Sequence, residues 1–267
     1  MFRGLRTSVV AGALLASLVG VLVVGLLTPT APSDRVIRFA TEADFPPFNE
    51  RSPPYGKITG WEIELGMAMC AKMHRKCEFV AQDWDGMIPG LLVHRFDGIF
   101  AAMTITAERR KKIEFTDPYY KTTAQFVAKN TLEVDRSSKS LGGLRIGTNP
   151  GVTQCYLSKH YPDAQVKVYQ NAQDLFLDLQ SGRVDAILSE PVQAEFGLIR
   201  RTPKGSFAFH GDPVQDPDCF GEGVGIGVRK DDPALRIALN KALAAVRADG
   251  TYDRLTVKYF GSDIFGK

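Results

Sequence analysis

The sequence has little net charge and no basic run interleaved with aromatic residues. Its 33 lysines and arginines nearly balance 30 aspartates and glutamates, which leaves a formal net charge of +3. The pattern typical of a nucleic-acid-binding protein is therefore missing. A hydrophobic content of 44% with 24% charged residues is ordinary for a globular protein. These values indicate a globular domain that does not bind nucleic acid.

The first thirty residues resemble an export signal. Arg3 and Arg6 precede an apolar run at 9–27, and small and proline residues follow at 28–32. The run approaches the length of a membrane span, which needs about 20 residues. The exit sequence is a poor cleavage site, because a proline would follow the cleaved bond. Residues 1–31 are thus predicted to be a cleaved signal peptide or an uncleaved N-terminal anchor. Both place the rest of the chain on the oxidising side of the membrane.

Cysteine is scarce, with only four residues. An even number in an exported protein favours disulfides. Cys70 and Cys77 lie close together, at the end of a predicted helix and the start of a predicted strand, and such a turn can bring them within bonding range. The alternative is a metal site with His74, but no second pair of ligands is nearby, so we expect no metal. Cys155 and Cys219 are the remaining candidate pair.

Predicted strands alternate with predicted helices along the chain, in two runs. The strands are expected at 36–40, 77–81, 97–103, 145–148, 166–169, 185–189 and 224–228. The helices are expected at 61–70, 85–93 with Asp85 as N-cap, 153–160, 174–180, 192–200, 233–248 and 252–260. This alternation predicts two α/β lobes built on parallel sheets. Ligands of such sheets bind beyond the carboxyl ends of the strands, here at 41–48, 101–109, 149–154 and 189–190.

The segment at 104–110 carries the strongest functional signal. A predicted strand runs into a hydroxyl-rich turn, and a short basic helix and another strand follow. Such a turn can gather the Thr104 hydroxyl, backbone N–H groups and the Arg109 guanidinium around one small volume. A planar guanidinium can bind both oxygens of a carboxylate. The alternative is an exposed helix N-terminus with a solvated arginine.

Six segments, at 39–48, 60–65, 84–91, 151–154, 182–186 and 247–252, follow in an order and spacing that resemble a known family. The chain is similar to the periplasmic polar amino-acid-binding proteins of ABC importers, solute-binding protein family 3, in the lysine/arginine/ornithine- and histidine-binding branch. The resemblance implies an α/β fold of the two-lobe periplasmic-binding-protein kind (type II). A ligand cleft would lie between lobes joined by two crossing strands. The Cys70 and Cys77 spacing also looks like the bridge found in that branch.

The family's lobe exchange implies the following boundaries. The first lobe would comprise 34–120 and 221–267, the second 125–215, and the crossing strands 121–124 and 216–220. The resemblance also implies a monomer in the periplasm that needs no cofactor. It would bind a small amino-acid ligand and meet an inner-membrane ABC permease.

When the family's ligand-binding positions are transferred to this sequence, the resemblance implies which residues bind the two charged groups of an amino acid. Arg109 would hold the α-carboxylate, helped by the N–H groups of Thr104 and of Thr153, which is followed by Gln154 at a helix start that favours anions. Glu190 stands where the family has an aspartate that binds the α-ammonium. Because glutamate is one methylene longer, the amino group must sit further out or the helix must shift.

The ligand side chain would lie between two rings, Phe45 and Trp84, which can sandwich an aliphatic stem or a guanidinium. Glu42 would pair with a cationic tip. The alternatives are that Trp84 is ordinary core and that Glu42 is a solvated loop acid. Ala101 and Ala102 replace two serines that usually line the pocket floor, and the residues at 149–150 also depart from the family. These departures leave room for an unusual ligand such as an opine.

Three hypotheses for function follow. The first is a receptor that captures a polar amino acid and delivers it to an ABC permease. We expect a cationic ligand, namely arginine, lysine, ornithine, histidine or a derivative such as an opine. The second is a periplasmic cyclohexadienyl (prephenate or arogenate) dehydratase on the same fold, with Glu190 as general acid. We find no second catalytic group beside it and so expect no enzyme and no catalytic residue. The third, a tethered sensor domain, is disfavoured because no signalling segment follows.

Overall fold

The computed structural model describes residues 35–52 and 56–261. The predicted signal peptide or anchor at 1–31 lies outside these residues. No helix within the described ranges is both long and apolar enough to cross a membrane.

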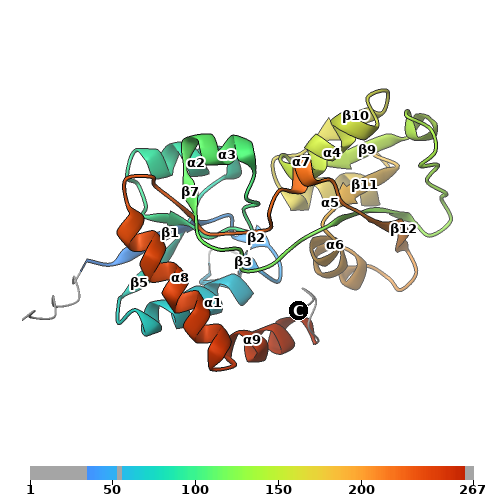
Figure 1. The fold of residues 1–267 in the computed structure, drawn as a ribbon. Helices are drawn as coiled ribbons and strands as arrows, with labels where there is room; N and C mark the ends of the chain where they lie inside the picture. The colour runs from blue at the N-terminus through green and yellow to red at the C-terminus, as the bar shows by residue number, and fades with distance from the viewer. Residues whose placement is uncertain (1–34, 53–55, 262–267) are drawn as a thin grey trace, which may run out of the picture. The chain divides into compact units, whose positions relative to one another are not determined.

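One five-stranded sheet is formed by the two ends of the described chain. Its order is β5-β1-β6-β13-β7, in which β1 pairs in parallel with β5 and β6 while β13 runs antiparallel to β6 and β7. The strand bounds are Ile37–Thr41 (β1), Cys77–Ala81 (β5), Gly98–Ile99 (β6), Glu114–Phe115 (β7) and Gly227–Val228 (β13). The helices that belong to it are Trp61–Lys72 (α1), Trp84–Leu92 (α2), Ala107–Lys112 (α3), Pro233–Ala248 (α8) and Thr251–Phe260 (α9). Figure 1 shows α8 beside α1, and the two helices are in contact.

The second five-stranded sheet is formed by the middle of the chain. Its order is β10-β9-β11-β8-β12, and β8 runs antiparallel to both β11 and β12. The strand bounds are Ala124–Lys129 (β8), Arg145–Thr148 (β9), Gln165–Val168 (β10), Ala186–Ser189 (β11) and Phe207–Val214 (β12). Its helices are Leu141–Gly143 (η1), Val152–His160 (α4), Ala172–Gln180 (α5), Pro191–Gly197 (α6), Ile199–Arg201 (η2) and Pro217–Phe220 (α7).

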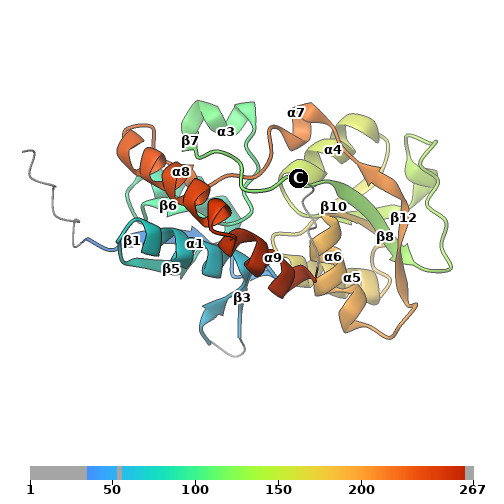
Figure 2. The same cartoon turned by 60° about the horizontal axis from the view of Figure 1, so that its bottom comes forward.

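A small antiparallel sheet follows β1. Asp44–Phe45 (β2) pairs with Asn49–Arg51 (β3), which pairs with Ile58–Thr59 (β4). Figure 2 shows β3 at the base of this projecting hairpin. This small sheet matters for function because its first strand, β2, begins two residues after Glu42.

Apolar residues at helical spacing build the first core. Trp61, Leu65 and Met69 recur every four residues on α1, are fully buried, and belong to one cluster with Phe100 and with Leu243 of α8. Deleting a side chain such as Leu65 from this cluster would cost about 2–5 kcal/mol.

The second sheet is covered on both faces, as the alternation of its strand residues requires. Ile187 of β11 points into a cluster with Leu175 and Leu179 of α5. Its neighbours Ala186 and Leu188 belong to a different cluster on the opposite face, which includes α4 and α7.

Several sequence-based expectations were wrong. Both sheets are mixed rather than purely parallel, because β8, β12 and β13 run against their neighbours, and neither β8 nor β12 was predicted. The strands expected at 97–103 and 224–228 form regular ladders only over β6 and β13, and Val224 adds isolated antiparallel bridges to Thr104 and Tyr120. Asp83, not Asp85, occupies the N-cap of α2.

The segment at 216–220 is not a crossing strand. Asp216 accepts a hydrogen bond from the Asp218 N–H and Pro217 occupies the first turn, so a helix, α7, starts there. Of the other predicted crossing segment, Ala124 already belongs to β8, whereas 121–123 are not in a helix or strand.

Both cysteine pairs are bonded. Cys70 and Cys77 join the end of α1 to the start of β5, with a Cα–Cα distance of 6.2 Å. Cys155 and Cys219 join α4 to α7 at 5.6 Å. The second bond holds α7 against α4, a helix that covers the second sheet.

Candidate functional site

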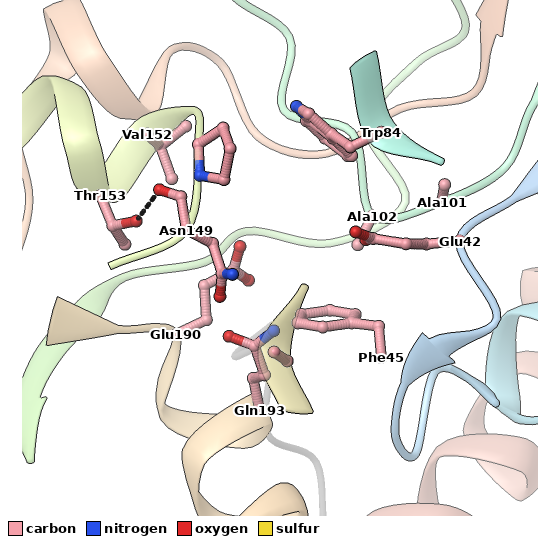
Figure 3. Close-up of a pocket in the computed structure, with 12 residues that line it drawn as sticks. Glu42, Phe45, Trp84, Ala101, Ala102, Asn149, Val152, Thr153, Glu190 and Gln193 are labelled. Atoms are coloured by element: carbon pink, nitrogen blue, oxygen red, sulfur yellow. Dashed lines mark hydrogen bonds between the residues drawn. The ribbon is translucent and has the colours of Figure 1, made fainter. Parts of the chain in front are cut away.

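A pocket with an empty volume of about 520 Å³, its opening included, lies at the carboxyl ends of strands from both sheets. Figure 3 shows the side chains from the two sheets facing one another across it. The first sheet and its hairpin contribute Glu42, Phe45, Trp84, Ala101 and Ala102. The second sheet contributes Asn149, Pro150, Val152, Thr153, Ala172, Glu190 and Gln193. The position agrees with the general rule for open α/β sheets.

Most of the residues predicted for the site line this pocket, but Thr104, Arg109 and Gln154 do not. Among the lining residues, Ala172 and Gln193 were missed. They lie in the first turns of α5 and α6, and the helix-start signals Asn171 and Pro191 could have revealed them.

Arg109 lies beside the pocket and is held from several sides. Its Nη1 donates to the carbonyl oxygen of Thr104 at 2.7 Å, and its guanidinium lies 5.1 Å from the ring centroid of Trp84. Its Nη2 would lie 3.3 Å from a Cβ built on Gly151, so the guanidinium reaches the loop before α4. Thr104 therefore positions Arg109 through its backbone. Burial lowers the pKa of Arg109 to about 10, although Glu190 opposes this, and the side chain stays cationic at neutral pH.

The loop before α4 is shaped to present backbone N–H groups. Gly151, the N-cap residue, has φ of 111°, which L-residues with a side chain rarely adopt. The Thr153 hydroxyl donates to the Asn149 carbonyl at 3.2 Å, and the Thr148 hydroxyl donates to Thr153 Oγ1 at 2.7 Å. The first N–H groups of a helix lack intrahelical partners, so those of Val152 and Thr153 suit an anion together with Arg109.

Glu190 is a buried acid at the other side of the pocket. Its Oε2 accepts a hydrogen bond from the Thr122 hydroxyl at 2.8 Å, so it is tied to the predicted crossing segment. The pKa of Glu190 is raised to about 7, mainly by burial and also by Glu62, while Thr122 and Arg109 act in the opposite direction.

Glu42 is a half-buried acid among other acids. Burial raises its pKa well above the usual range, and Asp44, Glu190, Glu62 and Asp83 add to the shift. The pKa of Asp44 is raised to about 6, again mainly by burial, and the Ala172 N–H opposes this by hydrogen bonding. The four side chains that add to this shift are all acids, and a bound cation would favour the ionised form of Glu42.

Two further polar side chains line the pocket. Asn149 Nδ2 donates to the Tyr169 carbonyl at 2.8 Å, whereas its buried Oδ1 has no hydrogen-bond partner in the described part of the chain. Gln193 Oε1 accepts from the Ser189 hydroxyl at 2.7 Å. Asn149 thus offers a free acceptor near Glu190, which Figure 3 shows beside it.

The two rings have unequal surroundings. Phe45 is buried and stacks on Phe48, with ring centroids 5.1 Å apart, and its remaining surface borders the pocket. Trp84 is half-buried and already has the Arg109 guanidinium on its ring. The predicted sandwich is therefore occupied in part by a cation of the protein itself.

The site shows no arrangement suited to a metal. No group of three or more histidine, cysteine, aspartate or glutamate side chains in the described ranges is placed to hold one.

Comparison with known proteins places these features in context. Residues 37–262 match the profile described as "Bacterial extracellular solute-binding proteins, family 3". The chain is 37% identical over 254 residues to the L-arginine-binding protein of Pseudomonas aeruginosa, covering 94% of this chain and 98% of the relative. It is 36% identical to the lysine/arginine/ornithine-binding periplasmic protein of Escherichia coli, covering 92% and 96%. An ancestral arginine-binding protein bound to arginine superimposes with a TM-score of 0.76 at 34% identity, covering 85% of this chain and 98% of that structure.

Proposed function

Because the chain belongs to the bacterial extracellular solute-binding proteins of family 3 and shares their two-lobe α/β fold, we propose that it is a receptor for a cationic amino acid. The ligand would be arginine, lysine, ornithine, histidine or a derivative such as an opine, and an ABC permease would receive it. The observation that carries this proposal is Glu42, a half-buried carboxylate in the pocket whose charged neighbours are all acidic.

The pocket supports a specific orientation of the ligand. Arg109 and the N–H groups at the start of α4 suit the α-carboxylate. Glu190 and the free Oδ1 of Asn149 suit the α-ammonium, and Glu42 suits a cationic tip. In this scheme Phe45 covers the aliphatic stem. The two lobes would be 34–120 with 221–267 and 125–215, as the family implies, and they would close over the ligand. The free energy of closure would come from contacts to both lobes.

We place the receptor in the periplasm, as the names of several relatives indicate for them, with residues 1–31 as its export signal or anchor. We propose no enzymatic activity. The relatives are named as binding proteins.

A thermal-shift and calorimetric panel tests the proposal on purified protein. Arginine, lysine, ornithine, histidine and the opine octopine should raise the unfolding temperature, and glutamine and glutamate should do so much less. A ligand at 100 times its dissociation constant adds about 2.7 kcal/mol of stability, which such a scan detects. Stabilisation by glutamate alone, or by none of the compounds, would overturn the assignment. Turnover of prephenate or arogenate would favour the dehydratase.

A further inference from the structure

A further carboxyl group, that of Glu62 on α1, lies outside the pocket, is fully buried and is hydrogen-bonded to segments that form the pocket. Its Oε1 accepts from the Ala102 N–H at 2.8 Å and from the Tyr119 hydroxyl. Its Oε2 accepts from Asn49 Nδ2 at 2.7 Å. Asn49 is also fully buried, and its Oδ1 accepts from the Ala43 N–H at 2.8 Å. Asn49 therefore links Glu62 to Ala43 by hydrogen bonds.

The two backbone positions at the ends of this network have positive φ and lie at the pocket. Ala43, with φ of 65°, lies directly after Glu42, and Ala102, with φ of 50°, lines the pocket. A positive φ is uncommon for alanine, and such a conformation persists only where the surroundings enforce it. The hydrogen bonds that connect Ala43, through Asn49, and Ala102 to Glu62 hold both residues in this backbone conformation.

The hydrogen-bond donors around Glu62 suit a carboxyl group at this position and disfavour an amide. Ala102, Tyr119 and Asn49 all donate, and they approach both oxygens of Glu62. Glutamine has one oxygen and one NH₂ group, so at least one of the donors would face another donor. Rotating the amide of Asn49 does not help, because its NH₂ group would then face the Ala43 N–H.

We propose that Glu62 is a positioning residue that sets the preference of the receptor for a cationic side chain. It does so by holding Glu42 through Asn49 and Ala43, and the pocket floor through Ala102. The inference rests on the proposed function. It assigns specificity to a residue that does not touch the ligand.

The test compares variants that remove different hydrogen bonds of this network, which runs from Glu62 to Ala102 and, through Asn49, to Ala43. In Glu62→Gln we expect at least about a tenfold loss of arginine affinity, and the ratio of arginine to glutamine affinity should fall by about threefold or more. Asn49→Ala breaks only the branch to Ala43, so it should lower the same ratio with less effect on glutamine. Glu64→Gln is the matched control on the same helix, because the Glu64 carboxylate accepts from Lys258 and Tyr259 at the surface, and the substitution should change neither quantity.

Leu65→Ala separates positioning from general destabilisation. This variant also damages α1 in the core, and it should weaken arginine and glutamine by the same factor. A Glu62→Gln protein that behaves like Leu65→Ala, or that binds arginine like the wild type, overturns the inference. If Glu62→Gln does not fold, an unchanged ratio in Asn49→Ala overturns it instead. Failure of the proposed function is distinguishable, because the wild type itself would then bind none of arginine, lysine, ornithine, histidine and octopine.

Discussion

At the scale of single residues, charge is distributed unequally around the pocket. Arg109 and the start of α4 offer positive potential, whereas Glu42 and Glu190 offer negative potential. An amino acid with a cationic side chain has charges that complement both parts. Each charged group can therefore be tested against a different part of the ligand.

Arg109→Ala should abolish useful binding of every α-amino acid, because all of them share the α-carboxylate. The loss of a charge-assisted contact in a closed site should cost at least about 3 kcal/mol. Isothermal titration with arginine and with glutamine measures it. Arg110→Ala is the control, since Arg110 pairs with Glu114 and Glu222 instead. Less than a tenfold loss in Arg109→Ala would contradict the assignment of the carboxylate clamp.

Glu42→Gln should weaken arginine and lysine by about 1–3 kcal/mol, as expected when one partner of a charged hydrogen bond is removed. Glutamine should be affected far less, because it has no charge at its tip. Parallel titrations of wild type and variant with arginine and glutamine decide it. The exposed acid Glu78, which pairs with Arg38, supplies a control substitution to glutamine. Equal losses for both ligands would mean that Glu42 is only a structural loop acid.

At the scale of elements, the two disulfides close loops of very different length. Cys70 and Cys77 are separated by 7 residues and Cys155 and Cys219 by 64. In the chain-entropy account the longer loop restricts the unfolded chain more. The longer loop also carries the last part of the second sheet, β12, and α7.

Replacing Cys155 and Cys219 together by serine should therefore destabilise the protein by about 4 kcal/mol, and replacing Cys70 and Cys77 by about 2–3 kcal/mol. Urea unfolding of both double variants against the wild type gives the two values. Mass spectrometry after alkylation without reductant first confirms that the wild type has no free thiol at these positions. The opposite order of destabilisation would show that the loop-length account does not apply here.

At the scale of the whole molecule, the buried acids link binding to pH. The pKa values of Glu190 and Glu62 rise to about 7 through burial, and that of Glu42 rises in the same direction. Acids whose pKa is raised on folding contribute stability that is complete below the unfolded pKa, near 4.5, and is lost as pH rises through about 7. A bound cation lowers the pKa values of Glu42 and Glu190 again, because it favours their ionised forms.

Arginine binding should therefore release protons between about pH 5 and 7, and affinity should rise with pH across that range by up to about tenfold per pH unit for each group. Titrations at pH 5.5 and 7.5, in two buffers of different ionisation enthalpy, measure both effects. Glu42→Gln should release fewer protons than the wild type. An affinity independent of pH over this range would show that neither acid meets the ligand cation.

Local sequence patterns were enough to predict several helices of this protein. The four-residue recurrence of Trp61, Leu65 and Met69 places α1, and α8 spans the range predicted for it, because such amphipathic periodicity is a property of the chain itself. The alternation of strands and helices, together with family resemblance, also predicted two α/β lobes and a pocket at the strand ends. The ends of strands predicted the binding segments 41–48 and 189–190. The choice of Glu42, Phe45 and Glu190 within these segments came from the family resemblance.

Only the tertiary structure decided the direction of β8 and β12, since strand pairing depends on partners distant in sequence. It alone showed that the face of Trp84 is used by Arg109, and that Thr104 acts through its carbonyl. It also revealed Glu62 beneath the pocket. In the sequence Glu62 looks like any acid in the first turn of a helix. Its importance arises because Asn49, Ala102 and Tyr119, far apart along the chain, all donate to one buried carboxylate.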